Sequence, residues 1–270
     1  MPGIVDFHSH VIPSVDDGST SIDQSLTALR AFAEQGVVNC VLTPHFDASL
    51  TRNSTALAAR LGEFDRSWTA LCAAVENADG LPQLHRGCEV MLDEPDADLS
   101  DPRIRLDGGR FVLCEFPSLR LPPNAEIAIH NLVDRGWQPI VAHPERYRNL
   151  DAGLERLRRL RDAGAYFQLN ATSLIGRHGE QPARVARRLL ELGWGEYLSS
   201  DYHARGIPGV AKALANLREW GGAAQALRMS EENPARMLAG ESPEPVSPLP
   251  PAARSSWIGR LLSRTDESNG

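Results

Sequence analysis

The sequence predicts an α/β fold with parallel strands, and two features support this prediction. Seven short runs are rich in apolar and β-branched residues, and they alternate with longer stretches that have helical periodicity. Strands and helices that alternate along a chain build parallel sheets. A chain of 270 residues is long enough for one α/β barrel or two small domains. The runs cover residues 3–8, 38–45, 84–91, 110–116, 138–143, 165–171 and 196–201.

The segments between the runs show helix start signals and apolar faces. Ser21 and Gln24 have the spacing of a capping box, and Ile22, Leu26 and Leu29 then lie on one helical face. Further helices are expected over residues 57–75, 124–135, 151–163, 181–192, 209–220 and 222–238, the last with a candidate break at Asn233-Pro234.

The composition changes near residue 241. Residues 242–251 read SPEPVSPLPP, a pattern typical of a proline-rich linker that does not pack against a core. We therefore expect one domain over residues 1–240, followed by a linker and a disordered tail over residues 241–270.

Charge and hydropathy exclude several classes of protein. A net charge of −7 argues against binding to nucleic acid. No apolar run reaches membrane-spanning length and no signal-peptide pattern is present, so a cytoplasmic protein is predicted. The four cysteines lack C-x-x-C spacing and are predicted to be buried thiols. Alternation along a strand turns Cys88 and Cys114 away from the glutamates that follow them.

The first run ends in the stretch DFHSHVIPSVDDG, residues 6–18. Side chains alternate between the two faces of a strand, so His8 and His10 point the same way. This is the spacing of a metal chelate, although a pair of hydrogen-bonded interior histidines is an equally good interpretation of this stretch alone.

Six of the seven runs end in histidine or carboxylate residues. The carboxyl ends of the strands of an α/β barrel meet at one rim, so side chains far apart in the sequence are expected to converge there. These residues are His8 and His10, His45, Glu89, Glu115, His143, and Asp201 with His203.

This set of side chains predicts a site with more than one metal ion. Histidine nitrogens and carboxylate oxygens without thiolates suit manganese, iron or zinc, and eight candidates exceed the needs of one tetrahedral zinc. A carboxylate such as Glu89 can bridge two ions about 3.5–4 Å apart, which suits phosphoester hydrolysis by a metal-bound hydroxide. We therefore expect two or three ions.

Seven motifs resemble those of the polymerase and histidinol phosphatase (PHP) superfamily, and within it the bacterial manganese-dependent protein tyrosine phosphatases of capsule and exopolysaccharide loci. The resemblance implies a distorted (β/α)7 barrel that binds up to three Mn²⁺ ions, with iron or zinc as alternatives. GCEV departs from the GQE-type form usual in that group, and the tail has no counterpart there. The motifs are DFHSHVIPSVDDG, VLTPH, GCEV, LCEFP, VAHPERYR, QLNATSLIGRHG and SSDYH.

The resemblance also implies three metal sites. The first comprises His8, His10, Glu89 and Asp201, and the second comprises Glu89, Glu115 and His143. The third comprises His45, His203 and an aspartate of the Asp16-Asp17 pair; Asp17 precedes Gly18 as in the family, and Asp16 is the alternative.

The resemblance further assigns roles in catalysis. Arg146 in the HPER motif would bind phosphate through its planar fork of donors and would act with His143 and Asp201. Arg205 is a weaker candidate for a second phosphate contact, and a surface ion pair is the alternative role for Arg146. Glu145 is expected to orient its neighbours.

The expected reaction is hydrolysis of phosphotyrosine on a protein, such as the tail of a bacterial tyrosine kinase that regulates polysaccharide export. The side chain of tyrosine reaches farther than that of serine, so it suits a recessed cluster. Four aromatic residues near the strand ends offer walls for its ring, with core packing as the alternative role. They are Phe46, Phe116, Tyr147 and Tyr202.

Three other functions compete with this interpretation. A histidinol phosphate or other small-molecule phosphatase would keep the metals and change the substrate, and a non-catalytic scaffold would use the metals for stability alone. The third is a cysteine-dependent phosphatase, because Cys114 and Arg120 match the C-x5-R pattern. That chemistry needs a loop whose N–H groups surround the phosphate, and this loop has no glycine and places a carboxylate beside the thiol.

Overall fold

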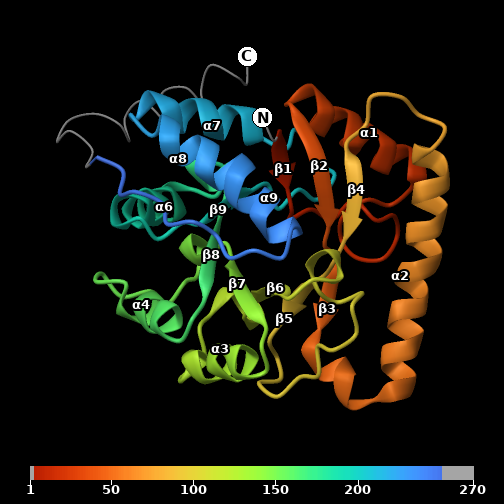
Figure 1. Ribbon diagram of the computed structural model, residues 1–270, viewed down its shortest axis with the longest axis horizontal. Helices are drawn as coiled ribbons and strands as arrows, with labels where there is room; N and C mark the ends of the chain where they lie inside the picture. The colour runs from red at the N-terminus through yellow and green to blue at the C-terminus, as the bar shows by residue number, and fades with distance from the viewer. Residues whose placement is uncertain (1–2, 251–270) are drawn as a thin grey trace.

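The computed structural model describes residues 3–250 and shows parallel strands with helices packed around them (Figure 1). Every strand pair in this part of the chain is parallel, which confirms the sequence prediction. A three-stranded sheet has the order β1 (Ile4–Asp6), β2 (Val37–Leu42), β4 (Gln83–Arg86). A six-stranded sheet has the order β3 (His45–Asp47), β5 (Glu89–Met91), β6 (Phe111–Glu115), β7 (Gln138–Ala142), β8 (Tyr166–Asn170), β9 (Tyr197–Ser199).

The second and third predicted runs each divide into two strands. Pro44 has no N–H to donate, so the ladder of β2 ends before it and resumes in β3. Gly87 separates β4 from β5, and a Cβ atom there would lie 3.0 Å from Leu106 Cδ2. As a result β3 and β5 join the larger sheet, where His45 pairs with Glu89.

Hydrogen bonds join the end of β1 to the segment after β9. Ser9 forms a bridge with Tyr202, and the His10 N–H donates to Tyr202 O at 2.8 Å. The Asp201 N–H donates to His8 O at 2.9 Å. These bonds bring the first and last of the predicted site motifs side by side.

Most helices lie within a few residues of the predicted positions, and the short helix over Ala171–Leu174 was not predicted. Ser21 caps the first helix by accepting a hydrogen bond from the Gln24 N–H, as the capping-box pattern predicts. The helices are α1 (Ile22–Glu34), α2 (Ser54–Val75), α3 (Ala125–Asp134), α4 (Glu155–Asp162), α5 (Ala171–Leu174), α6 (Glu180–Leu192), α7 (Val210–Glu219), α8 (Ala223–Leu227) and α9 (Asn233–Leu238). Within residues 3–250, none of them is long and apolar enough to cross a membrane.

The last predicted helix is continuous through its candidate break. A π-helical turn, Arg228–Glu232, joins α8 to α9. Asn233 has helical φ and ψ angles of −66° and −43°, so it does not act as a cap. Its buried side chain instead donates to Glu196 O at 2.9 Å and to Glu244 O at 3.0 Å.

Residues 241–250 pack against the domain, so the expectation that this segment does not contact a core is wrong. Val246 and Leu249 are buried, and the Leu249 N–H donates to Leu190 O at 2.8 Å. Figure 1 shows this segment as the blue chain that follows α9. The proline-rich composition hid these contacts because only two apolar side chains make them. The rest of the predicted tail, residues 251–270, lies outside the described residues.

Candidate metal centre

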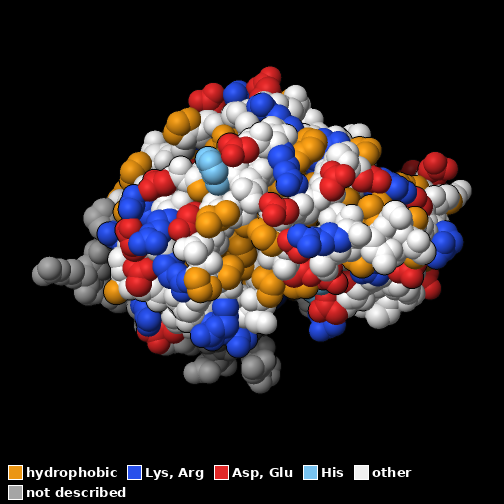
Figure 2. Space-filling view, turned by 90° about the horizontal axis from the view of Figure 1, so that it is seen from below, with side chains coloured by type: hydrophobic (Ala, Val, Ile, Leu, Met, Phe, Trp, Pro, Cys, Tyr) orange, Lys and Arg blue, Asp and Glu red, His pale blue; other side chains and the backbone are white. Residues whose placement is uncertain are grey.

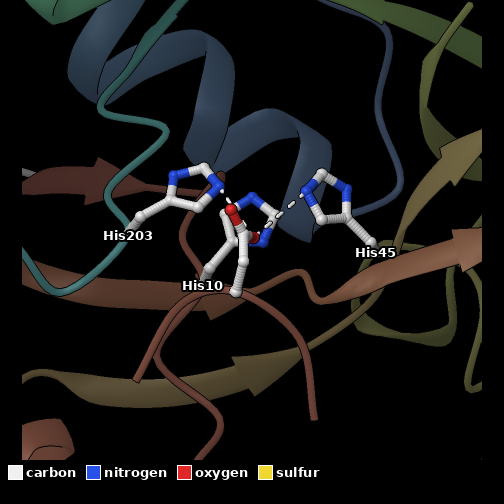
Figure 3. A group of neighbouring side chains, drawn as sticks. His10, His45 and His203 are labelled. Carbon is white, nitrogen blue, oxygen red and sulfur yellow. Dashed lines mark ion pairs between the residues drawn. The ribbon is translucent and has the colours of Figure 1, made fainter. Parts of the chain in front are cut away.

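The predicted ligands converge at the carboxyl ends of the strands. Three groups of their donor atoms lie close enough to share an ion: His8, His10, Glu89 and Asp201; His10, Asp17, His45 and His203; and His45, Glu89 and Glu115. Figure 3 shows the imidazole rings of His10, His45 and His203 gathered together.

The first group is buried, and its histidine tautomers are set by neighbouring side chains. His8 Nδ1 lies 2.9 Å from the Gln168 side-chain oxygen, which can only accept, so Nδ1 carries the proton. His8 Nε2 therefore faces Glu89 Oε1 at 3.2 Å and Asp201 Oδ1 at 3.3 Å, and it is the nitrogen available to an ion once it loses its proton. Gln168 was not among the predicted site residues, although it lies in the QLNATSLIGRHG motif.

The two aspartates of the DDG stretch have different roles. Asp16 Oδ2 lies 2.8 Å from His10 Nδ1 and accepts from the His45 N–H at 3.2 Å, so it orients both histidines. Asp17 Oδ1 faces His203 Nε2 at 3.3 Å and His45 Nε2 at 3.6 Å. This geometry favours Asp17 over Asp16 as the ligand.

Gly18 allows the loop to close over this group. A Cβ atom at Gly18 would lie 2.0 Å from His10 O, so only glycine fits there. The Gly18 N–H donates to Asp16 Oδ1 at 3.0 Å, which fixes the side chain that orients His10.

Glu89 lies at the centre of the cluster. Its Oε1 is 3.0 Å from His143 Nε2, and its Oε2 is 3.0 Å from His45 Nδ1. Although burial raises its pKa, the His8, His10 and His143 imidazoles outweigh burial and keep the pKa of Glu89 well below its ordinary value. A carboxylate placed between several imidazoles in this way is suited to bridge two ions.

The expected second site differs in one residue from the group that the structure brings together. His45 joins Glu89 and Glu115 there, while His143 Nε2 lies 3.8 Å from Glu115 Oε2. Burial and the charge of Glu89 raise the pKa of Glu115 to about 7. Without a cation, the two carboxylates repel each other.

The donor set fits divalent metal ions. Histidine nitrogens and carboxylate oxygens at these spacings match bonds of about 2.0–2.2 Å to a shared ion. Among the described residues, the buried His143 Nδ1 has no hydrogen-bond partner. Glu89 Oε2 forms no well-aligned hydrogen bond there either, although it faces His45 Nδ1 at 3.0 Å and His10 Nε2 at 3.4 Å. Burial disfavours the charged form of His8, but Glu89 and Asp201 raise its pKa to about 9, so protons and metal ions compete for this site.

Arg146 and Asn170 position the outer oxygen of Asp201. The Arg146 guanidinium and the Asn170 side-chain amide both donate to Asp201 Oδ2, the latter at 2.9 Å. Asp201 Oδ1 is left facing His8 and His10. Glu145 is buried, and its Oε1 accepts from the Asn170 N–H at 3.0 Å, which agrees with an orienting role. Asn170 was not predicted, because amide side chains serve many purposes.

Arg205 lies at the edge of the cluster. One of its terminal nitrogens donates to the Asp17 backbone oxygen at 2.7 Å, and the side chain is exposed. It is therefore close to the third group of ligands, beside His203 in the chain.

The cysteine-dependent alternative does not agree with the structure. Cys114 is completely buried, and burial, with Glu89 and Glu115 nearby, raises the pKa of its thiol far above the ordinary value. A buried, protonated thiol is a poor nucleophile. Cys88 and Cys114 pack in the apolar layer between strands and helices, on the face that alternation predicts.

The four aromatic residues near the strand ends are buried rather than open walls. Phe46, Phe116, Tyr147 and Tyr202 are at most 8% exposed. Core packing therefore explains them, and Phe116 in addition lines a neighbouring cavity.

Comparison with known proteins agrees with this geometry. The family model described as capsular polysaccharide synthesis, CpsB/CapC, matches residues 4–239. The chain belongs to this family. The relatives of this CpsB/CapC protein include the putative tyrosine-protein phosphatase CapC of Staphylococcus aureus, 26% identical over 96% of this chain and 100% of the relative. The tyrosine-protein phosphatase YwqE of Bacillus subtilis (strain 168) is 28% identical over 74% of this chain and 77% of its own.

Two solved structures resemble the structure of this chain. A structure from work on YwqE of Bacillus subtilis and CpsB of Streptococcus pneumoniae, described as unique metal-dependent tyrosine phosphatases, superposes with a TM-score of 0.75. It is 26% identical and covers 93% of this chain and 100% of its own. An organophosphorus hydrolase mutant from Deinococcus radiodurans, 14% identical over 88% of this chain and 93% of its own, has a TM-score of 0.54 and shares the fold alone.

Proposed function

We propose that this protein is a metal-dependent phosphatase that hydrolyses phosphotyrosine on proteins. The observation that supports it most is the cluster of histidines and carboxylates at the strand ends, with Arg146 beside it. The named activities of the CapC and YwqE relatives support the substrate class. The predicted distorted (β/α)7 barrel and the cytoplasmic location remain part of this proposal.

The candidate ligands would hold up to three divalent ions, and Mn²⁺ is the proposed metal with iron or zinc as alternatives. The first site would use His8, His10, Glu89 and Asp201. The second would use Glu89, Glu115 and His143, with His45 close by, and the third His45, His203 and Asp17. When bound, such ions supply positive charge and lower the pKa of water toward about 7.

The chain's own residues would bind and orient the phosphate. Arg146 donates from one terminal nitrogen to Asp201, and no other side chain in residues 3–250 accepts from its guanidinium. Its remaining N–H groups form a fork that matches two phosphate oxygens. Arg205 is the second proposed phosphate contact. Gln168 and Asp16 would keep the Nδ1 protons of His8 and His10 in place, so that the Nε2 atoms face the ion once a cation replaces their protons.

The proposed partner is the phosphorylated tail of a bacterial tyrosine kinase that regulates capsule or exopolysaccharide synthesis. The test is a panel of phosphotyrosine peptides, phosphoserine peptides and histidinol phosphate, assayed with Mn²⁺ and after EDTA. We expect phosphotyrosine to give the highest kcat/KM and EDTA to abolish turnover. A preference for histidinol phosphate would support the small-molecule alternative, and full activity in protein shown to be metal-free would contradict the mechanism.

Two variants separate metal binding from phosphate binding. His143→Ala removes a candidate ligand, so we expect a lower metal content and a loss of activity by orders of magnitude. Arg146→Ala should keep its metal and lose about 10²–10³-fold in kcat, the usual effect of removing one donor to transition-state charge. Equal metal loss in both proteins, measured by elemental analysis, would contradict these roles.

A further inference from the structure

A cavity of about 850 Å³ opens among the loops that follow β5, β6 and β7. Apolar side chains make up most of its wall, among them Leu92, Phe116, Pro117, Leu121 and Ile127. Ile127 belongs to α3 and is 53% exposed. Figure 2 views the molecule from the side of α3 in Figure 1 and shows apolar side chains gathered in a hollow with charged side chains around it.

This cavity, called the groove below, lies next to the candidate metal centre, and hydrogen bonds connect the two. Phe116 directly follows Glu115, and its N–H donates to the Tyr147 hydroxyl at 2.9 Å. Tyr147 directly follows Arg146. The Leu92 N–H donates to Glu115 O at 2.8 Å. The wall of the groove is therefore fixed to the residues next to a candidate ligand and next to the candidate phosphate-binding arginine.

Two arginines, Arg120 and Arg156, line the groove and make its wall positive. A third, Arg148, does not line it but is exposed nearby, and its backbone N–H donates to Leu119 O, next to Arg120 in the chain. None of the three forms an ion pair with a carboxylate in residues 3–250. The Arg156 guanidinium donates to backbone oxygens, including Leu121 O at 3.0 Å, and its backbone N–H donates to Asp151 Oδ2 at 3.2 Å. Within the described part of the chain, Asp93 is the one acidic residue that lines the cavity. This excess is local, because the chain as a whole has a net charge of −7.

We propose that this groove binds the part of the protein substrate that flanks the phosphotyrosine, and that it selects segments with apolar and acidic residues. This inference depends on the proposed function and adds the sequence preference of the same site. An extended peptide advances about 3.3–3.6 Å per residue, so a few residues beyond the phosphotyrosine reach the groove. Apolar side chains would contact Leu121 and Ile127. Acidic ones would be attracted by Arg120, which lines the groove, and by the exposed Arg148 nearby.

The test compares phosphotyrosine peptides with acidic, neutral and basic flanking residues, with p-nitrophenyl phosphate as a substrate that lacks flanks. We expect the acidic peptide to have at least a tenfold higher kcat/KM than the basic one. In the double variant Arg120→Glu, Arg148→Glu this preference should disappear or reverse. The fold-decrease in kcat/KM for the acidic peptide should be at least ten times the fold-decrease for p-nitrophenyl phosphate. A variant with both Arg30→Glu and Arg66→Glu, on the exposed surfaces of α1 and α2, is the control for the same change in net charge.

Each result decides between explanations. Equal kcat/KM for all three peptides, or equal losses for peptide and p-nitrophenyl phosphate in the double variant, would overturn the groove's role while leaving the phosphatase assignment intact. Failure to hydrolyse any phosphotyrosine peptide would instead contradict the proposed function. A double variant that changes the oligomeric state in solution and keeps the acidic preference would show that the groove binds a second copy of this chain. Ile127→Ser should weaken only peptides with an apolar flank.

Discussion

Asp201 owes its orientation to a chain of hydrogen bonds that starts outside the cluster. His178 Nε2 lies 2.7 Å from Thr172 Oγ1, whose hydroxyl donates to Asn170 Oδ1 at 2.7 Å. Asn170 then donates to Asp201. The Thr172 proton is used toward Asn170, so His178 must donate, and every bond in the chain points toward the carboxylate. Hydrogen bonds in such a chain polarise one another, so the last bond, from Asn170 to Asp201, is strengthened.

Breaking this chain should weaken metal binding without removing a ligand. Asn170→Ala removes a direct donor to Asp201, so we expect about 10–100-fold weaker binding of Mn²⁺, the usual effect of losing an orienting partner. Thr172→Val should have a smaller effect in the same direction, and Thr172→Ser, which keeps the hydroxyl, should resemble the wild type. Calorimetric titration of the metal-free proteins measures this, and equal affinities for the valine and serine variants would contradict it.

Glu145 should make stability depend on pH. Burial is the main cause that raises its pKa to about 7, from an ordinary value of 4.5. The folded state therefore binds this proton more tightly than the unfolded state, so the contribution of Glu145 to stability falls as pH rises from about 4.5 through 7. A pKa shift of this size changes the free energy of unfolding by about 3 kcal/mol at most.

The variant Glu145→Gln isolates this effect, because it keeps an oxygen acceptor for the Asn170 N–H and does not titrate. We expect the variant to gain stability relative to the wild type as pH rises from 5 to 8, measured by thermal unfolding of both proteins in EDTA. A difference between the two proteins that stays constant with pH would show that Glu145 does not titrate in this range.

The residue types of the site were predictable, whereas some of their partners were not. Metal chemistry restricts ligands to a few side chains, so His8, Glu89 and Asp201 are evident from their places at strand ends. Gln168 and Asn170 carry no such restriction. Asp16 and Asp17 are chemically identical neighbours, and only the turn at Gly18 distinguishes them.

At the scale of elements, the end of α6 is shaped to receive residues 241–250. Gly193 has φ +67° at the end of this helix, and a Cβ atom there would lie 2.6 Å from Val246 O. Gly136, after α3, has a similar φ of +84° with no atom within 4 Å of the added Cβ. Alanine at either glycine would strain the backbone, but only alanine at Gly193 would also collide with residues 241–250. Comparing the two variants therefore separates these two effects.

Gly193→Ala should be more destabilising than Gly136→Ala. Both variants require alanine in the left-handed region, which costs about 1–2 kcal/mol. Only Gly193→Ala also displaces Val246, which adds about 1–3 kcal/mol. In a chain that ends at residue 240 this extra cost should vanish, because the obstructing backbone is gone. Equal unfolding free energies for the two variants in the full chain would contradict the packing seen here.

Sequence periodicity predicts the elements well where one face of an element is apolar. Residues 181–192 were expected to be a helix and form α6 (Glu180–Leu192). The divisions between β2 and β3 and between β4 and β5 were missed, because Thr43-Pro44 and Gly87-Cys88 lie inside continuous apolar runs. Only pairing with distant strands shows that these runs belong to two sheets.

At the scale of the whole molecule, residues 241–250 connect the last helices to the strands. Ser242 Oγ accepts from Arg110 and Gln138 at 3.2 Å, near the start of β6 and β7. Arg187, on α6, donates to Pro250 O. None of the hydrogen bonds of this segment within residues 3–250 reaches a candidate metal ligand, so its contribution is to stability.

A chain that ends at Gly240 should be less stable than one that ends at Pro250. It loses the burial of Val246 and Leu249, worth about 1.5–3 kcal/mol each before the cost of ordering the segment is subtracted. It also leaves the buried Asn233 amide without the Glu244 oxygen and the Leu190 oxygen without the Leu249 N–H. We expect a net loss of about 2 kcal/mol, or roughly 4–8 °C in melting temperature for a chain of this size. Activity on p-nitrophenyl phosphate at low temperature should remain in both truncated chains. Equal melting temperatures would show that residues 241–250 add nothing to the stability of the domain, as their composition alone suggests.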